Sequence, residues 1–166
     1  MALHSLEAEQ TLSHPLDLVE HSMGVRDFMA ERTGRDELVA EITGRWCDYH
    51  LVFAWSDEIG ALHMTCAFDV RVQRERRAAV HELLALANDK LWIGHFDIGS
   101  DDGLPAFRHA LLLRGGTLSV EQIEDLVDIA VSEIDRFYPA FQYVVWGNRR
   151  APEALELAIL ETIAEA

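Results

Sequence analysis

Hydrophobic and polar residues alternate along two neighbouring stretches of the chain, residues 47–56 and 61–71. A period of two is typical of β-strands that bury one face, and residues 57–60 between them have the composition of a turn. The pattern predicts a hairpin in which Trp55 faces Met64 and Phe53 faces Cys66. The same register places His50 opposite Asp69 and Asp48 opposite Arg71, two favourable cross-strand pairs on the polar face.

Similar patterns predict the remaining elements. Strands are expected at residues 28–32, 37–43, 92–98 and 106–113, and the last two form a hairpin around an Asp- and Gly-rich loop. Apolar residues at helical spacing predict helices at 15–25 and 74–91, a third that opens at Ser119, and a fourth at 152–163. Pro15 suits a first helical turn, and Ser119 with Gln122 forms a capping box. Pro139 is expected to end or kink the third helix before an apolar segment at 141–146.

The order of these elements indicates the fold class. Strands joined by tight turns favour an antiparallel sheet, so we predict an α+β fold of about five to six strands flanked by helices. Residues 1–14 are interpreted as an N-terminal tail and residues 15–166 as a single domain, because no linker or repeat interrupts them. A chain of 166 residues is long enough to bury a core without disulfides or metal.

The net charge of the chain limits the kinds of partner that it is expected to bind. The chain has 14 basic and 29 acidic residues and a net charge of −15, which repels nucleic acid and anionic membranes. A basic cluster near residue 74 is interpreted as a solvated helix face paired with neighbouring acids; it contains Arg71, Arg74, Arg76 and Arg77. No apolar run is long enough to span a bilayer, and the N-terminus lacks a secretory signal. We therefore predict a cytoplasmic protein that binds neither nucleic acid nor membrane.

Candidate catalytic chemistry is confined to one predicted hairpin. His95 and His109 lie on consecutive strands and Asp97 is two residues from His95, a combination that suits a divalent metal or a general base. The side chains around them are mostly apolar, which favours packing, and no known enzyme motif occurs. We expect no catalytic residue, no metal and no cofactor. A metal-dependent or small-ligand enzyme built on this hairpin is the alternative.

The four tryptophans are the candidate interaction residues. Trp46, Trp55, Trp92 and Trp146 all fall at or near the ends of predicted elements. Indole side chains are favoured where one side is apolar and the other wet, including at protein interfaces, whereas core capping is the alternative explanation. The free edge strands of the predicted sheet offer a second mode of binding, the addition of a partner's strand.

Several segments resemble the YbjN domain family. They are W-I-G-H-F-D-I (residues 92–98), F-R-H-A-L-L-L-R-G-G (107–116), S-V-E-Q-I-E-D-L-V (119–127) and F-Y-P-A-F-Q-Y-V-V-W-G (137–147). The resemblance extends from residue 15 to the C-terminus, and residues 22–35 depart from the family pattern. Members are described as bacterial sensory transduction regulators. The resemblance implies a fold similar to type III secretion chaperones, with no catalytic residue and no cofactor.

These observations lead to one expected function. We predict a non-enzymatic protein-interaction module, either a regulator of sensory or stress signalling or a chaperone-like adaptor. It is expected to bind a polypeptide of unknown identity and to form a homodimer.

Overall fold

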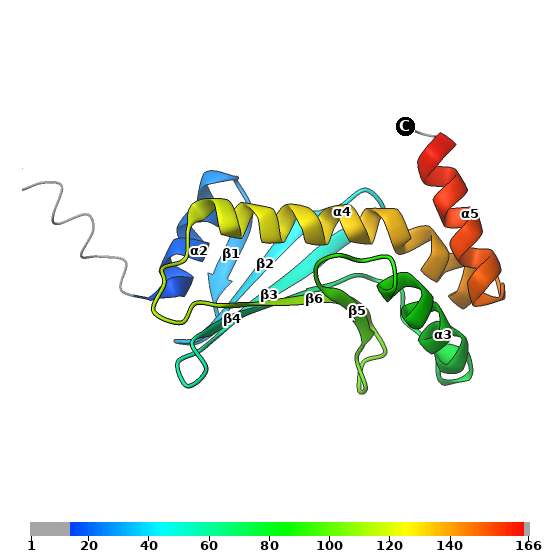
Figure 1. Cartoon of the computed structure of the whole chain (residues 1–166), viewed down its shortest axis with the longest axis horizontal. Coiled ribbons are helices and arrows are strands. Elements are labelled where there is room, and N and C mark those ends of the chain that lie inside the picture. The colour runs from blue at the N-terminus through cyan, green and yellow to red at the C-terminus, as the bar shows by residue number, and fades with distance from the viewer. Residues whose placement is uncertain (1–13, 165–166) are drawn as a thin grey trace, which may run out of the picture.

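The computed structural model describes residues 14–164, which form a six-stranded sheet with helices packed on it (Figure 1). The helices are α2 (Pro15–Val25), α3 (Arg77–Asn88, preceded by the short helix η1, Arg74–Arg76), α4 (Val120–Val145) and α5 (Ala151–Ala164). The strands are β1 (Met29–Arg32), β2 (Glu37–Thr43), β3 (Asp48–Ser56), β4 (Ala61–Ala67), β5 (His95–Ile98) and β6 (Pro105–Leu112). The predicted tail lies outside the described residues except for His14, the N-cap of α2.

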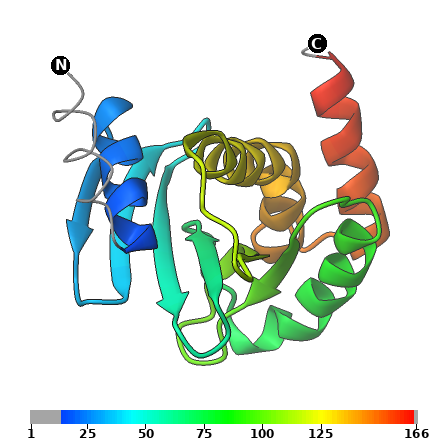
Figure 2. The same cartoon turned by 60° about the vertical axis from the view of Figure 1, so that its left-hand side comes forward.

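Neighbouring strands are antiparallel throughout, in the order β1-β2-β3-β4-β6-β5, which confirms the predicted α+β class. The helices α2 and α4 lie on the same side of this sheet (Figure 2). The side chains that face them are the ones that alternation predicted, and each is at most 6% exposed. On β2, β3 and β4 they are Leu38, Ala40, Ile42, Tyr49, Leu51, Phe53, Leu62, Met64 and Cys66.

The register predicted for the β3–β4 hairpin is wrong by two residues. Phe53 pairs with Met64 and Trp55 pairs with Leu62, so each partner lies two positions earlier in β4 than expected. The loop of residues 57–60 causes the shift, because it pairs Ser56 with Ala61, and Gly60 donates its N–H to the Ser56 carbonyl at 2.8 Å. A shift of two keeps every side chain on its predicted face.

The predicted cross-strand charge pairs are therefore absent. His50 pairs with Ala67 instead of Asp69. Asp48 pairs with Thr43 of β2 and, because β4 ends at Ala67, does not pair with Arg71. After Ala67 the chain no longer pairs with β3. The Phe68 N–H instead donates to the Pro105 carbonyl at 3.2 Å.

Pro139 does not end α4, which continues to Val145 and includes the apolar segment expected to be separate. A proline inside a helix leaves the carbonyl four residues earlier without its donor, here that of Asp135. The indole Nε1–H of Trp46 donates to this carbonyl at 2.9 Å, and the Trp46 ring stacks on Tyr138. The helix continues because a side chain from the β2–β3 turn supplies the missing hydrogen bond.

Two arginines of the predicted basic cluster, Arg76 and Arg77, have a structural role. Arg76 donates to the Val144 carbonyl through Nε at 3.0 Å and through Nη2 at 2.7 Å, and Arg77 donates to the Ser100 carbonyl at 3.1 Å. Carbonyls in the last turn of a helix lack intrahelical donors, so Arg76 satisfies the end of α4. These two arginines bind backbone carbonyls instead of the neighbouring acids that were expected.

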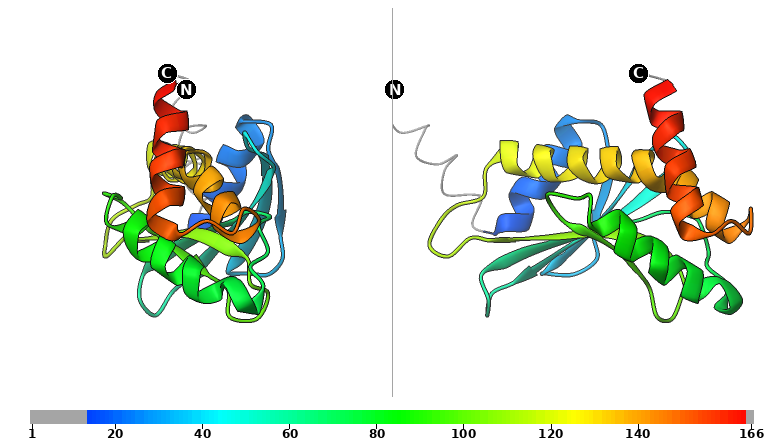
Figure 3. Two further views of the ribbon diagram at one scale, coloured as in Figure 1. Left: turned by 90° about the vertical axis from the view of Figure 1, so that its right-hand side faces the viewer. Right: turned by 45° about the vertical axis from the view of Figure 1, so that its right-hand side comes forward.

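The core joins the two halves of the chain. Phe96 of β5 lies with its ring centroid 5.5–6.2 Å from those of four other phenylalanines, Phe68, Phe107, Phe137 and Phe141. The burial of each phenylalanine side chain contributes about 1.5–3 kcal/mol to the stability of the fold. At one end of the molecule α5 packs against α4 and α3 (Figure 3). None of the described helices is long and apolar enough to cross a bilayer.

Candidate functional site

The structure does not bring the four candidate tryptophans together. Trp46 is 38% exposed and is held against α4 by its hydrogen bond to the Asp135 carbonyl and by stacking on Tyr138. Trp92 precedes β5 and is 100% exposed, and Trp146 follows α4 and is 60% exposed. Trp55, near the end of β3, is half-buried and lines a surface groove. It is the tryptophan around which a site is built.

The predicted His95, Asp97 and His109 cluster does not form. His95 pairs with Arg108 across β5 and β6, and directly paired residues share one face of the sheet. His109 is the next residue of β6, so its side chain lies on the opposite face. Among the described residues no group of three His, Cys, Asp or Glu side chains is placed to hold a metal ion. The alternative enzyme hypothesis therefore loses its site.

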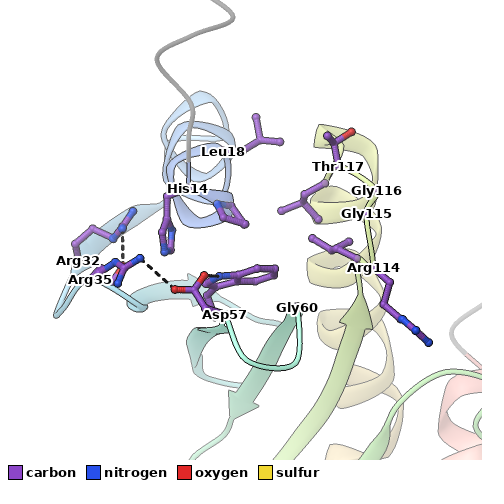
Figure 4. A pocket seen from close by; sticks show the side chains of 14 residues that line it. His14, Leu18, Arg32, Arg35, Asp57, Gly60, Arg114, Gly115, Gly116 and Thr117 are labelled. Atoms are coloured by element: carbon purple, nitrogen blue, oxygen red, sulfur yellow. Dashed lines mark hydrogen bonds and ion pairs between the residues drawn. The ribbon is translucent and has the colours of Figure 1, made fainter.

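The groove at Trp55 lies between α2 and the loop that joins β6 to α4 (Figure 4). Its volume is about 900 Å³. Half-buried apolar side chains form the floor and both walls, namely Pro15, Leu18, Trp55, Leu113 and Leu118. The polar residues of the lining are His14, Arg32, Arg35, Asp57, Arg114 and Thr117, and three glycines, Gly60, Gly115 and Gly116, complete it. We call this surface the Trp55 groove.

Local hydrogen bonds fix the polar side of the Trp55 groove. The imidazole of His14 caps α2, because its Nδ1 accepts the Leu16 N–H at 3.2 Å, and its Nε2 lies 3.0 Å from a carboxylate oxygen of Asp36. The indole of Trp55 donates to Asp57 at 2.7 Å, and Asp57 also accepts from Arg35 at 3.1 Å. These side chains are held in place before any ligand arrives.

The rim of the Trp55 groove is basic although the chain is acidic. Arg32 is neutralised by Asp17 at 3.0 Å and Glu20 at 3.8 Å. Arg35 is 74% exposed and shares Asp57, whereas Arg114 has no hydrogen-bond or ion-pair partner among residues 14–164. In Figure 4 the Arg114 side chain extends outward from the β6–α4 loop. Two exposed guanidinium groups thus flank an apolar floor on opposite walls.

A second candidate surface is the face of the sheet opposite α2 and α4, which we call the open face. One cross-strand row runs over all six strands, Glu31–Val39–Val52–Thr65–Arg108–His95. A second row runs beside it, Met29–Glu41–His50–Ala67–Ala106–Asp97. In the first row the central side chains of Val39, Val52 and Thr65 are half-buried, whereas in the second row Glu41 and His50 are exposed.

The edges of the sheet are poorly suited to strand addition. The side-chain amide of Asn88 donates to the Phe96 carbonyl at 3.0 Å and accepts the Phe96 N–H at 2.7 Å. It thereby occupies the outer hydrogen-bonding groups of the edge strand β5. The other edge strand, β1, has only four residues, and short edges limit pairing with another chain.

Comparison with known proteins establishes the relationship of this chain. A family model described as "Putative bacterial sensory transduction regulator" and named YbjN matches residues 15–143. The chain belongs to the YbjN family. The crystal structure of YbjN from E. coli, described as "a putative transcription regulator", is similar with a TM-score of 0.50 and 12% identity, over 90% of this chain and 92% of that chain. At this identity the likeness concerns the fold alone. No curated protein matches the sequence.

The YbjN match covers the open face and all of the Trp55 groove except His14, whereas Trp146 and α5 lie beyond it. Sequence reasoning identified Trp55 but missed its neighbours in the groove, among them Leu18, Arg35 and Leu118. These residues come from separate segments, so no local motif identifies them. A partial signal is the pair Gly115-Gly116, which marks the loop that forms one wall.

Proposed function

We propose that this YbjN-family protein is a non-enzymatic regulator or adaptor of the cytoplasm that binds another polypeptide in the Trp55 groove. The observation that carries the proposal is an apolar groove, with the indole of Trp55 in its lining, flanked by the exposed guanidinium groups of Arg35 and Arg114. Aromatic residues and arginine are the side chains most enriched in binding hot spots. The partner segment is apolar and acidic: its apolar side chains contact the floor and its carboxylates meet the two arginines.

The chemistry of the groove favours binding over catalysis. Both ring nitrogens of His14 are engaged, one with the Leu16 N–H and the other with Asp36. Asp57 accepts from Trp55 and Arg35. A general acid or base needs a group within reach of the substrate and free to exchange its proton, and these side chains already serve as structural partners.

The experiment is affinity capture from a lysate of the organism that makes the protein, with the bound polypeptides identified by mass spectrometry. The double variant Arg35→Glu/Arg114→Glu reverses the charge of the rim without altering the apolar floor. We expect it to lose a polypeptide that the wild type retains, with affinity reduced at least about tenfold, or ~1.4 kcal/mol. Trp55→Ala should lose the same polypeptide.

The matched control is Arg71→Glu/Arg150→Glu, which makes the same change of net charge at two exposed positions outside the groove lining. The control should capture the partner as well as the wild type does. Equal capture by the groove variant and the control would contradict the proposal, as would a partner without an acidic, apolar segment.

A further inference from the structure

The open face has opposite charges at its two ends. At the β1–β2 end lie three glutamates, Glu31, Glu37 and Glu41, all of them exposed. At the β6–β5 end lie Arg108 and His95, which are paired across the two strands, together with Asp97, whose carboxylate is 3.5 Å from Arg108. Between the two ends the central row contains only Val39, Val52 and Thr65. The face is therefore acidic at its β1–β2 end and has a guanidinium group and an imidazole at its β6–β5 end, while His50 and His63 lie on the strands between them.

Within one chain, some of these charged groups lack a partner of opposite charge or a hydrogen-bond acceptor. Glu31 has no ion-pair partner among residues 14–164. Arg108 lies 3.5 Å from Asp97, and its Nε–H is buried without an acceptor. A guanidinium group has five N–H donors, and a buried donor without an acceptor is costly. The Arg108 side chain is 36% exposed, so its outer N–H groups can meet a further carboxylate, and the acidic end has a carboxylate without a cation.

The size and shape of the open face suit a dimer interface. Six strands about 4.8 Å apart span roughly 24 Å, and the nine residues of β3 extend roughly 30 Å. Because β1 and β5 have only four residues each, the face covers roughly 600 Å², the lower end of the range per partner for specific interfaces. In the central row the side chains of Val39, Val52 and Thr65 let a second sheet approach to the ordinary packing distance of about 10 Å.

We propose that the open face binds a second copy of this chain, with the two-fold axis parallel to the strands. This axis places the β1–β2 end of one copy on the β6–β5 end of the other, so that Glu31 meets Arg108 and His95 of the second copy. A two-fold axis across the strands would place Glu31 against Glu31, and like charges in contact are unfavourable. Only the first arrangement pairs opposite charges, and by symmetry each pair occurs twice.

This inference uses a different surface from the Trp55 groove and does not depend on it. The measurement is sedimentation velocity over a range of protein concentrations. We expect a reversible dimer for the wild type and a monomer for Val52→Lys, which places a charge at the centre of the open face. The matched control is Val25→Lys, the same substitution at a position that is 69% exposed at the end of α2. It should remain a dimer.

Substitutions that reverse the charge of Glu31 or Arg108 test the proposed orientation of the two copies. Glu31→Arg and Arg108→Glu should each raise the dissociation constant of the dimer at least about tenfold. The double variant Glu31→Arg/Arg108→Glu should recover affinity, because it restores opposite charges in the pair. A wild-type protein that stays monomeric, or a dimer that Val52→Lys leaves intact, overturns the interface. A dimer dissolved by Val52→Lys but insensitive to charge reversal overturns the orientation. None of these results decides the capture experiment, which tests the Trp55 groove separately.

Discussion

Two histidines of the sheet, His63 and His109, are held toward their neutral form. Burial lowers the pKa of His63, and the positive charge of Arg108 lowers it further. Burial also lowers the pKa of His109, with a smaller contribution from His95. The unfolded chain, in which a histidine has its ordinary pKa of about 6.5, therefore binds protons more readily than the native state. Stability contributed by the two neutral histidines is present above that pH and is lost as the pH falls through it.

We expect the free energy of unfolding to decrease between about pH 7.5 and pH 5, partly through these two side chains. The measurement is urea denaturation at both pH values for the wild type and for His63→Gln/His109→Gln. The double variant should lose less stability on acidification than the wild type. His21→Gln, an exposed position on α2, is the control and should follow the wild type. A double variant with an unchanged pH dependence would refute the role of the histidines.

At the scale of elements, α4 and the β2–β3 turn stabilise each other through Asp135. Its carbonyl accepts from the Trp46 indole, and its carboxylate accepts from the Arg45 N–H at 3.1 Å and from the Tyr49 hydroxyl at 2.5 Å. Burial, followed by the hydrogen bond to Asp135, raises the pKa of Tyr49 well above its ordinary value. The hydroxyl therefore stays protonated and donates to the carboxylate. One residue of a helix thus satisfies two donors of a distant turn and one donor at the start of β3.

This arrangement predicts energetic coupling between Trp46 and Pro139. In the wild type, Trp46→Phe removes the donor for the Asp135 carbonyl. With alanine at position 139 the backbone N–H returns and satisfies that carbonyl, so the same substitution should cost less. A double-mutant cycle of Trp46→Phe and Pro139→Ala, measured by chemical denaturation, should show a coupling free energy of about 0.5–1.5 kcal/mol. Additive effects would mean that the indole does not replace the missing helical hydrogen bond.

The same elements show what the sequence predicts and what it does not. Helical spacing and Pro15 predicted α2, and the capping box of Ser119 and Gln122 predicted the start of α4, because these signals are local. The register of β3 and β4 failed because it depends on how many residues the turn contains. The possible end of the helix at Pro139 did not occur, because the donor that replaces the missing N–H lies 89 residues away at Trp46. The Trp55 groove was missed for the same reason, since its walls meet only in the folded chain.

At the scale of the whole molecule, net charge opposes compactness. A chain with a net charge of −15 repels itself when folded, more so than in the expanded unfolded state. Salt shortens the Debye length from about 30 Å at 0.01 M to about 8 Å at 0.15 M and so screens this repulsion. Salt also weakens exposed ion pairs such as Arg35 with Asp57, but such pairs contribute little.

We therefore expect stability to rise with salt. The urea concentration at the midpoint of unfolding should be higher at 0.15 M than at 0.01 M sodium chloride, measured at one protein concentration. The Val52→Lys variant, which we expect to be monomeric, serves as the control, because an increase that persists in it does not arise from dimerisation. A midpoint that falls with salt would show that surface ion pairs outweigh the net repulsion.

Proteins are synthesised from the N-terminus, and the contact between Trp46 and Asp135 therefore has a consequence during translation. The β2–β3 turn leaves the ribosome long before the helix that completes it, because 89 residues separate the two partners. Until α4 emerges, the Trp46 indole and the Tyr49 hydroxyl have no partner from that helix, and the inner face of β4 and β6 stays without its helical cover. A nascent chain that stalls before residue 135 thus presents a partly uncovered sheet to chaperones and proteases, and completion of the fold is an event of late synthesis.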